Sequence, residues 1–439
     1  MSMSQAVKQR SMSWYALAYA GTGIAQKGFG FLLAMWLART LTKDEYAQFG
    51  LLFALQSGLT AFAMAGIVEV VISFLGTHRD APARARLYRA ANTVFLGLSG
   101  LLAVGAVAVY LLYLRGAGIG MWPFVCVLAG ALLAAQFLVQ ASLVRLEERH
   151  GAAIVFAFWA PVAGFVGAAC AFALRPAVDS YFFGFAAASL LTMLAARLRG
   201  AGYFSASRDA AEIAPVRKSI GPYIGVAVLG WASGYGNVWV VEGLFTPALV
   251  AEFAFAYTLA SILQLAANAM NQVWSPRFFK IVGTLPPHEI ESQNMKFYRL
   301  QGLVLGLVSV AFLVVLPHLQ RLFGGNLSEY HVTGGLAWLF AGYAVTIPWW
   351  HAQNYFLFKG EGARLMRIVL ATTATGMLAW FGVMVALGPA GIYLGFFLLM
   401  ALRSAGIWFV ARRLWSIGLP WQGPAIACAL IAVPALAAL

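Results

Sequence analysis

Apolar stretches that are each long enough to cross a lipid bilayer follow one another along almost the whole chain. A hydrocarbon core of about 30 Å needs roughly 20 residues of helix, and twelve stretches meet that length. They cover approximately residues 13–38, 46–75, 90–114, 120–144, 152–175, 179–198, 219–244, 248–273, 297–317, 333–358, 365–387 and 391–411. Sheets with open edges and irregular loops cannot face lipid, because their backbone polar groups would lack hydrogen-bond partners. The pattern therefore predicts an all-α integral membrane protein with about twelve transmembrane helices.

The basic residues lie mainly in alternate connections between these stretches. If the N-terminus is cytoplasmic, 22 of the 29 Lys and Arg residues fall in cytoplasmic segments and five in external ones. By the positive-inside rule, this asymmetry predicts a multi-pass protein with a cytoplasmic N-terminus. The net charge of +14 is then the signature of the cytoplasmic face of a membrane protein, favoured further by anionic lipid headgroups. No nucleic-acid partner is expected, because no soluble domain carries a basic patch.

The connection at 201–218 divides the stretches into two sets of six, within 1–200 and 219–415. The first stretch of each set is rich in glycine and polar residues, and Leu41-Thr42 aligns with Phe245-Thr246. Chance similarity between apolar segments could produce the same weak alignment. A six-span repeat keeps one orientation in the membrane, so we expect an N-lobe and a C-lobe of six helices each around a central cavity.

Motifs typical of enzymes are missing from the sequence. It has no phosphate-binding Gly-Lys loop, no spaced Cys and His ligands and no paired acids on an exposed loop. The chain is therefore not expected to be an enzyme, and its short connections disfavour a membrane polymerase or ligase acting on sugars. The apolar C-terminal segment, 416–439, is too short to span comfortably, and a re-entrant, interfacial or truncated span would each fit it.

Two segments resemble a known family. The first is Leu37–Leu52, LARTLTKDEYAQFGLL, which is followed by AMAGIVEVVI, and the second is Glu252–Lys280, EFAFAYTLASILQLAANAMNQVWSPRFFK. Both are similar to segments of the Wzx-type flippases of lipid-linked oligosaccharides. Many members carry an Asp-Arg pair in the seventh span, where this chain has Asn237 and Val238. An ion-pair role at that point is therefore in doubt.

The resemblance implies the multidrug/oligosaccharidyl-lipid/polysaccharide exporter superfamily, with two lobes and alternating access. It implies a protein of the bacterial cytoplasmic (inner) membrane that moves an undecaprenyl-pyrophosphate-linked oligosaccharide to the outer leaflet, for O-antigen, capsule or exopolysaccharide synthesis. Expected partners are this substrate, membrane lipids, and polysaccharide polymerase and chain-length machinery. No cofactor is expected other than a coupling proton or sodium ion. The alternative is a cation-coupled multidrug exporter of the same superfamily.

Three ionisable residues lie within or close to apolar stretches. Lys27 is near the centre of the first span, too deep for its ammonium group to reach the membrane surface. It should therefore face an anion, a water-filled cavity or a partner in an ion pair. Glu69, in the second span, could pair with Lys27, bind a coupling proton or approach the headgroups. Arg403, in the last span, could line the cavity or pair within the C-lobe.

Polar residues form a helical stripe in the eighth span. They recur every three or four residues and so occupy one face; the members are Ser261, Gln264, Asn268, Asn271 and Gln272. A stripe of this length predicts a cavity lining, because amides both donate to and accept from sugar hydroxyls. Gln56, Gln136, Gln140, Gln353 and Asn354 form shorter patterns of the same kind. Interhelical hydrogen bonding explains those shorter patterns equally well.

Overall fold

A computed structural model describes residues 28–75, 80–147, 149–282, 284–415 and 417–437. Within these ranges the chain is almost entirely helical and has no β-strand, and nine of the described helices are long and apolar enough to cross a membrane. The predicted all-α membrane class is confirmed. Of the predicted first span, only the helix Gly28–Thr40 is described.

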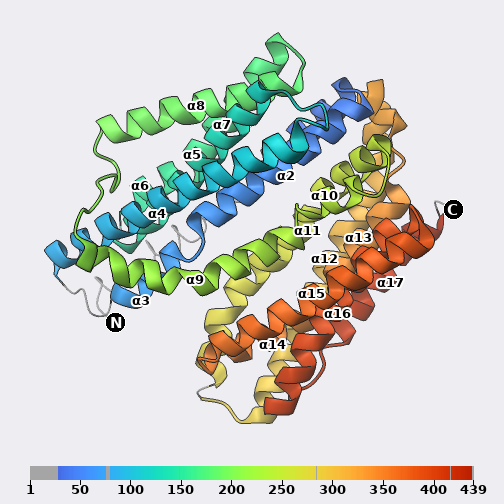
Figure 1. Cartoon of the computed structure of the whole chain (residues 1–439). Coiled ribbons are helices and arrows are strands. Elements are labelled where there is room, and N and C mark those ends of the chain that lie inside the picture. Colours follow the sequence, from blue (N-terminus) through green and yellow to red (C-terminus); the bar gives the residue numbers. More distant parts are fainter. Residues whose placement is uncertain (1–27, 76–79, 148, 283, 416, 438–439) are drawn as a thin grey trace, which may run out of the picture. The chain divides into compact units, whose positions relative to one another are not determined.

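The described residues form two compact units (Figure 1). The first contains the residues up to Trp36 and Gln48–Gly236, and the second contains Leu37–Ala47 and the residues from Asn237 onward. The lobe limits expected from the sequence, on either side of 201–218, remain a prediction.

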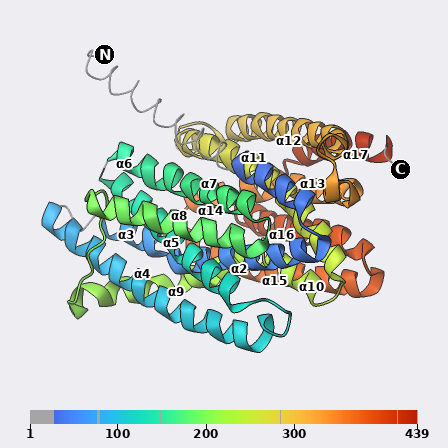
Figure 2. The ribbon, with the colours of Figure 1, turned by 90° about the horizontal axis from the view of Figure 1, so that it is seen from above.

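The described part of the first unit contains the beginning of the helix Gly28–Thr40, most of α2 and seven further helices. The labelled helices are α2 (Lys43–Met64), α3 (Ile67–Leu75), α4 (Ala81–Val109), α5 (Met121–Leu146), α6 (His150–Ile154), α7 (Ala160–Leu174), α8 (Val178–Leu198) and α9 (Ala210–Ala232), with π-helical turns at Tyr110–Leu114 and Val155–Trp159. Helices α7 and α8 lie side by side (Figure 2). Gly167 and Gly184 permit this approach, because a Cβ atom on either would overlap the carbonyl oxygen of the other.

The second predicted span is broken near its C-terminal end. Helix α2 stops at Met64 and α3 begins at Ile67, with Gly66 between them at φ 72°, a conformation that favours glycine. A Cβ atom at Gly66 would also lie 2.5 Å from the Cβ of Tyr223 on α9. Trp231, further along α9, donates its Nε1 proton to the carbonyl of Ala54 at 2.7 Å. The break thus accommodates α9 against the α2–α3 pair.

Amide side chains of α4 and α5 hold the segment that precedes α9. Gln140 Nε2 donates to the carbonyl of Tyr203 at 3.1 Å, and the Tyr203 amide donates to Gln140 Oε1 at 2.7 Å. Asn92 Nδ2 donates to the Phe204 carbonyl at 2.9 Å, and Gln136 Nε2 donates to Asn92 Oδ1 at 3.2 Å. Gln136 and Gln140 therefore make interhelical and loop contacts, one of the two roles that the sequence allowed.

Eight complete helices lie in the described part of the second unit. They are α10 (Asn237–Glu242), α11 (Pro247–Val282), α12 (Pro287–Phe323), α13 (Thr333–Ala344), α14 (Ile347–Phe358), α15 (Gly362–Leu387), α16 (Ala390–Trp415) and α17 (Gln422–Ala437), with a 3₁₀ turn at Gly325–Glu329. The predicted tenth span is therefore two helices, with Pro348 at the start of α14, where a missing N–H group costs nothing. The predicted seventh span is also divided, between α9 and α10.

The segment Leu37–Ala47 is fastened to the second unit by polar contacts. Lys43 Nζ lies 2.8 Å from Glu252 Oε1 and 5.8 Å from the centre of the Tyr330 ring. Asn326 Nδ2 donates to the carbonyl of Leu41 at 2.9 Å. Burial, reinforced by the Glu252 and Glu329 carboxylates, raises the pKa of Tyr330, so its hydroxyl stays protonated at neutral pH. The ion pair joins the two segments that carry the family resemblance.

The C-terminal apolar segment, whose topology the sequence left open, forms α17 and packs along α12 (Figure 2). Glycines line the contact: a Cβ atom at Gly302 would overlap the carbonyl oxygen of Gly423, and one at Gly306 would lie 2.6 Å from Leu430 Cδ1. Small residues spaced four apart let helix backbones approach closely in membranes. Helix α17 is therefore an integral part of the second unit.

Candidate functional site

Polar side chains gather inside the second unit where α11, α12 and α14 meet. Asn354 is fully buried, and its Nδ2 donates to Asn271 Oδ1 at 3.0 Å and to the Tyr298 hydroxyl at 3.3 Å. The Ser275 hydroxyl donates to Asn354 Oδ1 at 2.8 Å. We name Asn271, Ser275, Tyr298 and Asn354 the Asn354 cluster. Because its bonds join three helices, it fixes their mutual position.

His351 lies one turn before Asn354 on α14 and is 1% exposed. Its ring packs edge-on between Tyr298, at 5.2 Å between ring centres, and Tyr355, at 5.4 Å. The rings of His351 and Tyr355 thus pack beside the Asn354 cluster, next to its member Tyr298.

Arg403 of α16 is placed by aromatic and hydroxyl groups of α11, α13 and α14. Its guanidinium lies over the Trp349 ring at 4.2 Å from the centre, a cation–π geometry. The Tyr343 hydroxyl donates to the Tyr257 hydroxyl at 3.2 Å, and both side chains lie near Arg403. The Trp349 amide donates to the Ser404 hydroxyl at 3.1 Å. The arginine thus lies among residues of the second unit.

The polar stripe of α11 changes its surroundings along the helix. Gln264 is exposed and Asn268 is half-buried, whereas Asn271 is buried in the Asn354 cluster. Ser261 is also buried and donates to the carbonyl of Thr258 at 2.7 Å. The backbone of Gln272 is part of α11, and its side chain lies outside the described part. Among the described members, only Gln264 and Asn268 are open to a ligand.

The remaining predicted residues are dispersed. Lys27 lies outside the described residues. Glu69 is exposed on α3, and Gln56 is 6% exposed in the first unit, where its Nε2 would lie 3.0 Å from a Cβ atom at Gly130. The structure therefore unites Asn271 with Asn354, and no other candidate side chain that it describes joins that cluster.

A stripe on α12 was missed by the sequence interpretation. Asn294, Tyr298 and Gln301 are buried and spaced four and three residues apart, the signal that identified the stripe of α11. Trp274 Nε1 donates to Asn294 Oδ1 at 3.2 Å, and Gln301 Nε2 donates to the Ala267 carbonyl at 3.3 Å. These residues pair α12 with α11.

Carboxylates are confined to the helix ends. In the described helices each lies within six residues of an end of its helix. They are Asp44, Glu45, Glu69, Asp179, Glu212, Glu242, Glu252, Glu289 and Glu291. Arg403, by contrast, is the fourteenth residue of the 26-residue α16. Further than six residues from a helix end, the described helices therefore carry several cations, Arg403 among them, and no carboxylate.

Solved structures share this architecture. The chain superposes on the inward closed conformation of the lipid II flippase MurJ with a TM-score of 0.70 and 10% identity, over 96% of this chain and 92% of that one. An inward-facing multidrug-resistance MATE family transporter of the MOP superfamily gives 0.64 and 15% identity, over 91% and 98%. The chain has the fold of these transporters. The Vibrio cholerae MATE transporter VcmN, in a mutant form, gives 0.53 and 15%, over 95% and 99%. No protein-family model and no curated protein matches the sequence.

Proposed function

We propose that the chain is a flippase that moves an undecaprenyl-pyrophosphate-linked oligosaccharide from the inner to the outer leaflet of the bacterial cytoplasmic membrane by alternating access. The fold shared with MurJ, a lipid II flippase, supports this proposal. The Wzx-like segments Leu37–Leu52 and Glu252–Lys280 favour a substrate destined for surface polysaccharide.

The distribution of charged residues along the helices favours an anionic substrate over a cationic one. An exporter coupled to cations, or one that takes cationic drugs, is expected to use carboxylates inside the membrane. The described helix interiors have none, and the sequence places Lys27 deep in the first span. A pyrophosphate group needs cations of this kind as counter-charges. We assign that role to Lys27, and leave Glu69 as the candidate for orienting it or carrying a coupling proton.

A strain that lacks this protein tests the proposal. It should lose surface polysaccharide and accumulate lipid-linked repeat units on the cytoplasmic side of its inner membrane. Normal surface polymer would remove the assignment. If polymer is normal and overexpression changes drug susceptibility, the multidrug exporter that the MATE structures represent becomes the better interpretation.

Gln264 gives a prediction about the cavity lining, because it is the exposed member of the α11 stripe. Gln264→Ala should slow substrate transfer about tenfold, since one or two hydrogen bonds of roughly 1 kcal/mol each are lost, while the Tm of the purified protein stays unchanged. Thr375→Ala, at an exposed position on α15, is the control and should have wild-type activity. Equal transfer rates for both variants would exclude Gln264 from the lining.

A further inference from the structure

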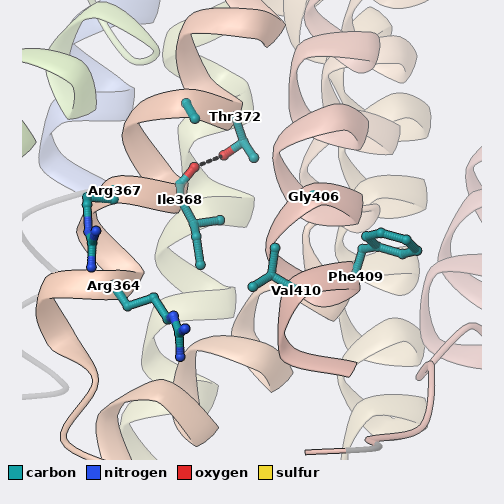
Figure 3. Close-up of a pocket in the computed structure, with 8 residues that line it drawn as sticks. Arg364, Arg367, Ile368, Thr372, Gly406, Phe409 and Val410 are labelled. Carbon is teal, nitrogen blue, oxygen red and sulfur yellow. Dashed lines mark hydrogen bonds between the residues drawn. The ribbon is translucent and has the colours of Figure 1, made fainter. Parts of the chain in front are cut away.

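A groove lies between α15 and α16, away from the Asn354 cluster (Figure 3). Its volume is about 530 Å³, within the range of sites that hold small molecules. The lining residues are Arg364, Arg367, Ile368, Ala371, Thr372, Gly406, Phe409 and Val410. The two helices approach closely where Gly406 faces Thr372: a Cβ atom at Gly406 would overlap the Thr372 side chain.

The two ends of the groove differ in chemistry. Figure 3 shows Thr372 and Arg364 at opposite ends, with Arg367 between them beside Ile368. The Thr372 hydroxyl donates to the carbonyl of Ile368 at 2.8 Å, so it is already occupied. Between Arg367 and Thr372, five residues of helix rise about 7.5 Å, and the other lining residues there, Ile368 and Ala371, are apolar. The groove therefore combines a cationic end with an apolar channel.

Few carboxylates among the described residues lie close to the arginines at the cationic end of the groove. Arg364 Nη1 lies 3.7 Å from Glu361 Oε2, and both side chains are more than 40% exposed. Within the described part of the chain, Arg367 has no carboxylate within 4 Å. Arg413 adds charge beside this end, with its guanidinium 4.2 Å from the centre of the Phe409 ring. The net charge at this end of the groove is therefore positive. The sequence predicts that this end faces the cytoplasm.

The apolar surface continues along α15 beyond the groove. Leu378 is 73% exposed and Phe381 46% exposed, as expected for side chains that face hydrocarbon. A ligand in the groove thus meets arginines at the level of the lipid headgroups and apolar side chains deeper in the membrane. An amphiphile with an anionic head and an apolar chain matches both.

We propose that this groove binds an anionic glycerophospholipid of the inner leaflet. Its phosphate lies between Arg364 and Arg367, where guanidinium groups can donate paired hydrogen bonds, and one acyl chain lies over Ile368, Ala371 and Val410. This lipid is a bound partner of the second unit and differs from the proposed transport substrate. The site does not depend on the flippase assignment.

Native mass spectrometry of the purified full chain tests the site by titration with palmitoyl-oleoyl phosphatidylglycerol and with phosphatidylcholine of the same acyl chains. The wild type should bind phosphatidylglycerol preferentially. Arg364→Gln/Arg367→Gln should weaken phosphatidylglycerol binding about tenfold, because each basic residue close to an anionic headgroup contributes to the binding free energy. Lys280→Gln/Arg299→Gln changes the charge equally at exposed positions outside the groove and should bind as the wild type does.

A second pair of variants tests whether lipid binding depends on the apolar channel of the groove and not only on the charge of the arginines. Ala371 is exposed and lines the groove, and Ala374 is exposed one turn further along α15 and does not. Ala371→Trp should fill the channel and reduce phosphatidylglycerol binding as strongly as the arginine double variant, whereas Ala374→Trp should not. Equal binding by both tryptophan variants, equal affinity for phosphatidylcholine, competition by inorganic phosphate alone, or preference for undecaprenyl phosphate would overturn the proposal.

Discussion

Gly302→Leu should prevent the second unit from assembling. The backbones of α12 and α17 meet at this point, and even a Cβ atom would overlap the carbonyl oxygen of Gly423. The contact is equally close on the other side, because a Cβ atom at Gly423 would overlap the carbonyl oxygen of Tyr298 on α12. Overpacking typically costs about 1 to 3 kcal/mol and occasionally more, and an overlap with backbone belongs to the upper end of that range. Monodisperse protein recovered after detergent extraction, measured by size-exclusion chromatography, should fall close to zero.

Gly382→Leu is the matched control for this substitution. Gly382 also lies inside a membrane helix, α15, but a Cβ atom there has no neighbour within 4 Å. This variant should be recovered at wild-type levels, since leucine is a good helix former. If Gly302→Leu is recovered equally well, α17 does not pack on α12 through these glycines.

Asn354→Leu should destabilise the protein by about 2 to 4 kcal/mol, because it leaves buried polar groups of Asn271, Tyr298 and Ser275 without their partner. The Tm in detergent should fall accordingly. Asn271→Leu/Asn354→Leu removes both members of the 3.0 Å hydrogen bond, so its loss should be smaller than the sum of the two single losses. Strict additivity would show that Asn271 and Asn354 do not interact.

Hydropathy and charge were sufficient to predict the all-α membrane class and the approximate positions of most spans. They could not reveal the break at Gly66, because the residues on both sides are apolar and the break depends on Tyr223 of α9. For the same reason α13 and α14 were predicted as one span. Hydropathy measures transfer into lipid and does not sense contacts between distant helices.

The α11 stripe shows what periodicity can and cannot give. Gln264 and Asn271 are seven residues apart, so they share one face of the helix. Gln264 is exposed, whereas Asn271 is covered by Asn354 of α14. The spacing predicts the face, but the residues that cover each level of that face come from other helices. The sequence therefore identified candidates for a cavity lining without separating them from the Asn354 cluster.

The most direct test of the flippase proposal is transfer by the purified protein in proteoliposomes. A fluorescent undecaprenyl-pyrophosphate-linked oligosaccharide is placed in both leaflets, and its accessibility to an external quencher is followed over time. The wild type should make the inner-leaflet pool accessible, Lys27→Ala should not, and Lys27→Arg should retain partial activity because it keeps the charge. Equal transfer by Lys27→Ala and the wild type at matched protein levels would contradict the role of the central cation. If the wild type transfers no more substrate than protein-free vesicles do, the proposal that this chain is a flippase for lipid-linked oligosaccharides is wrong.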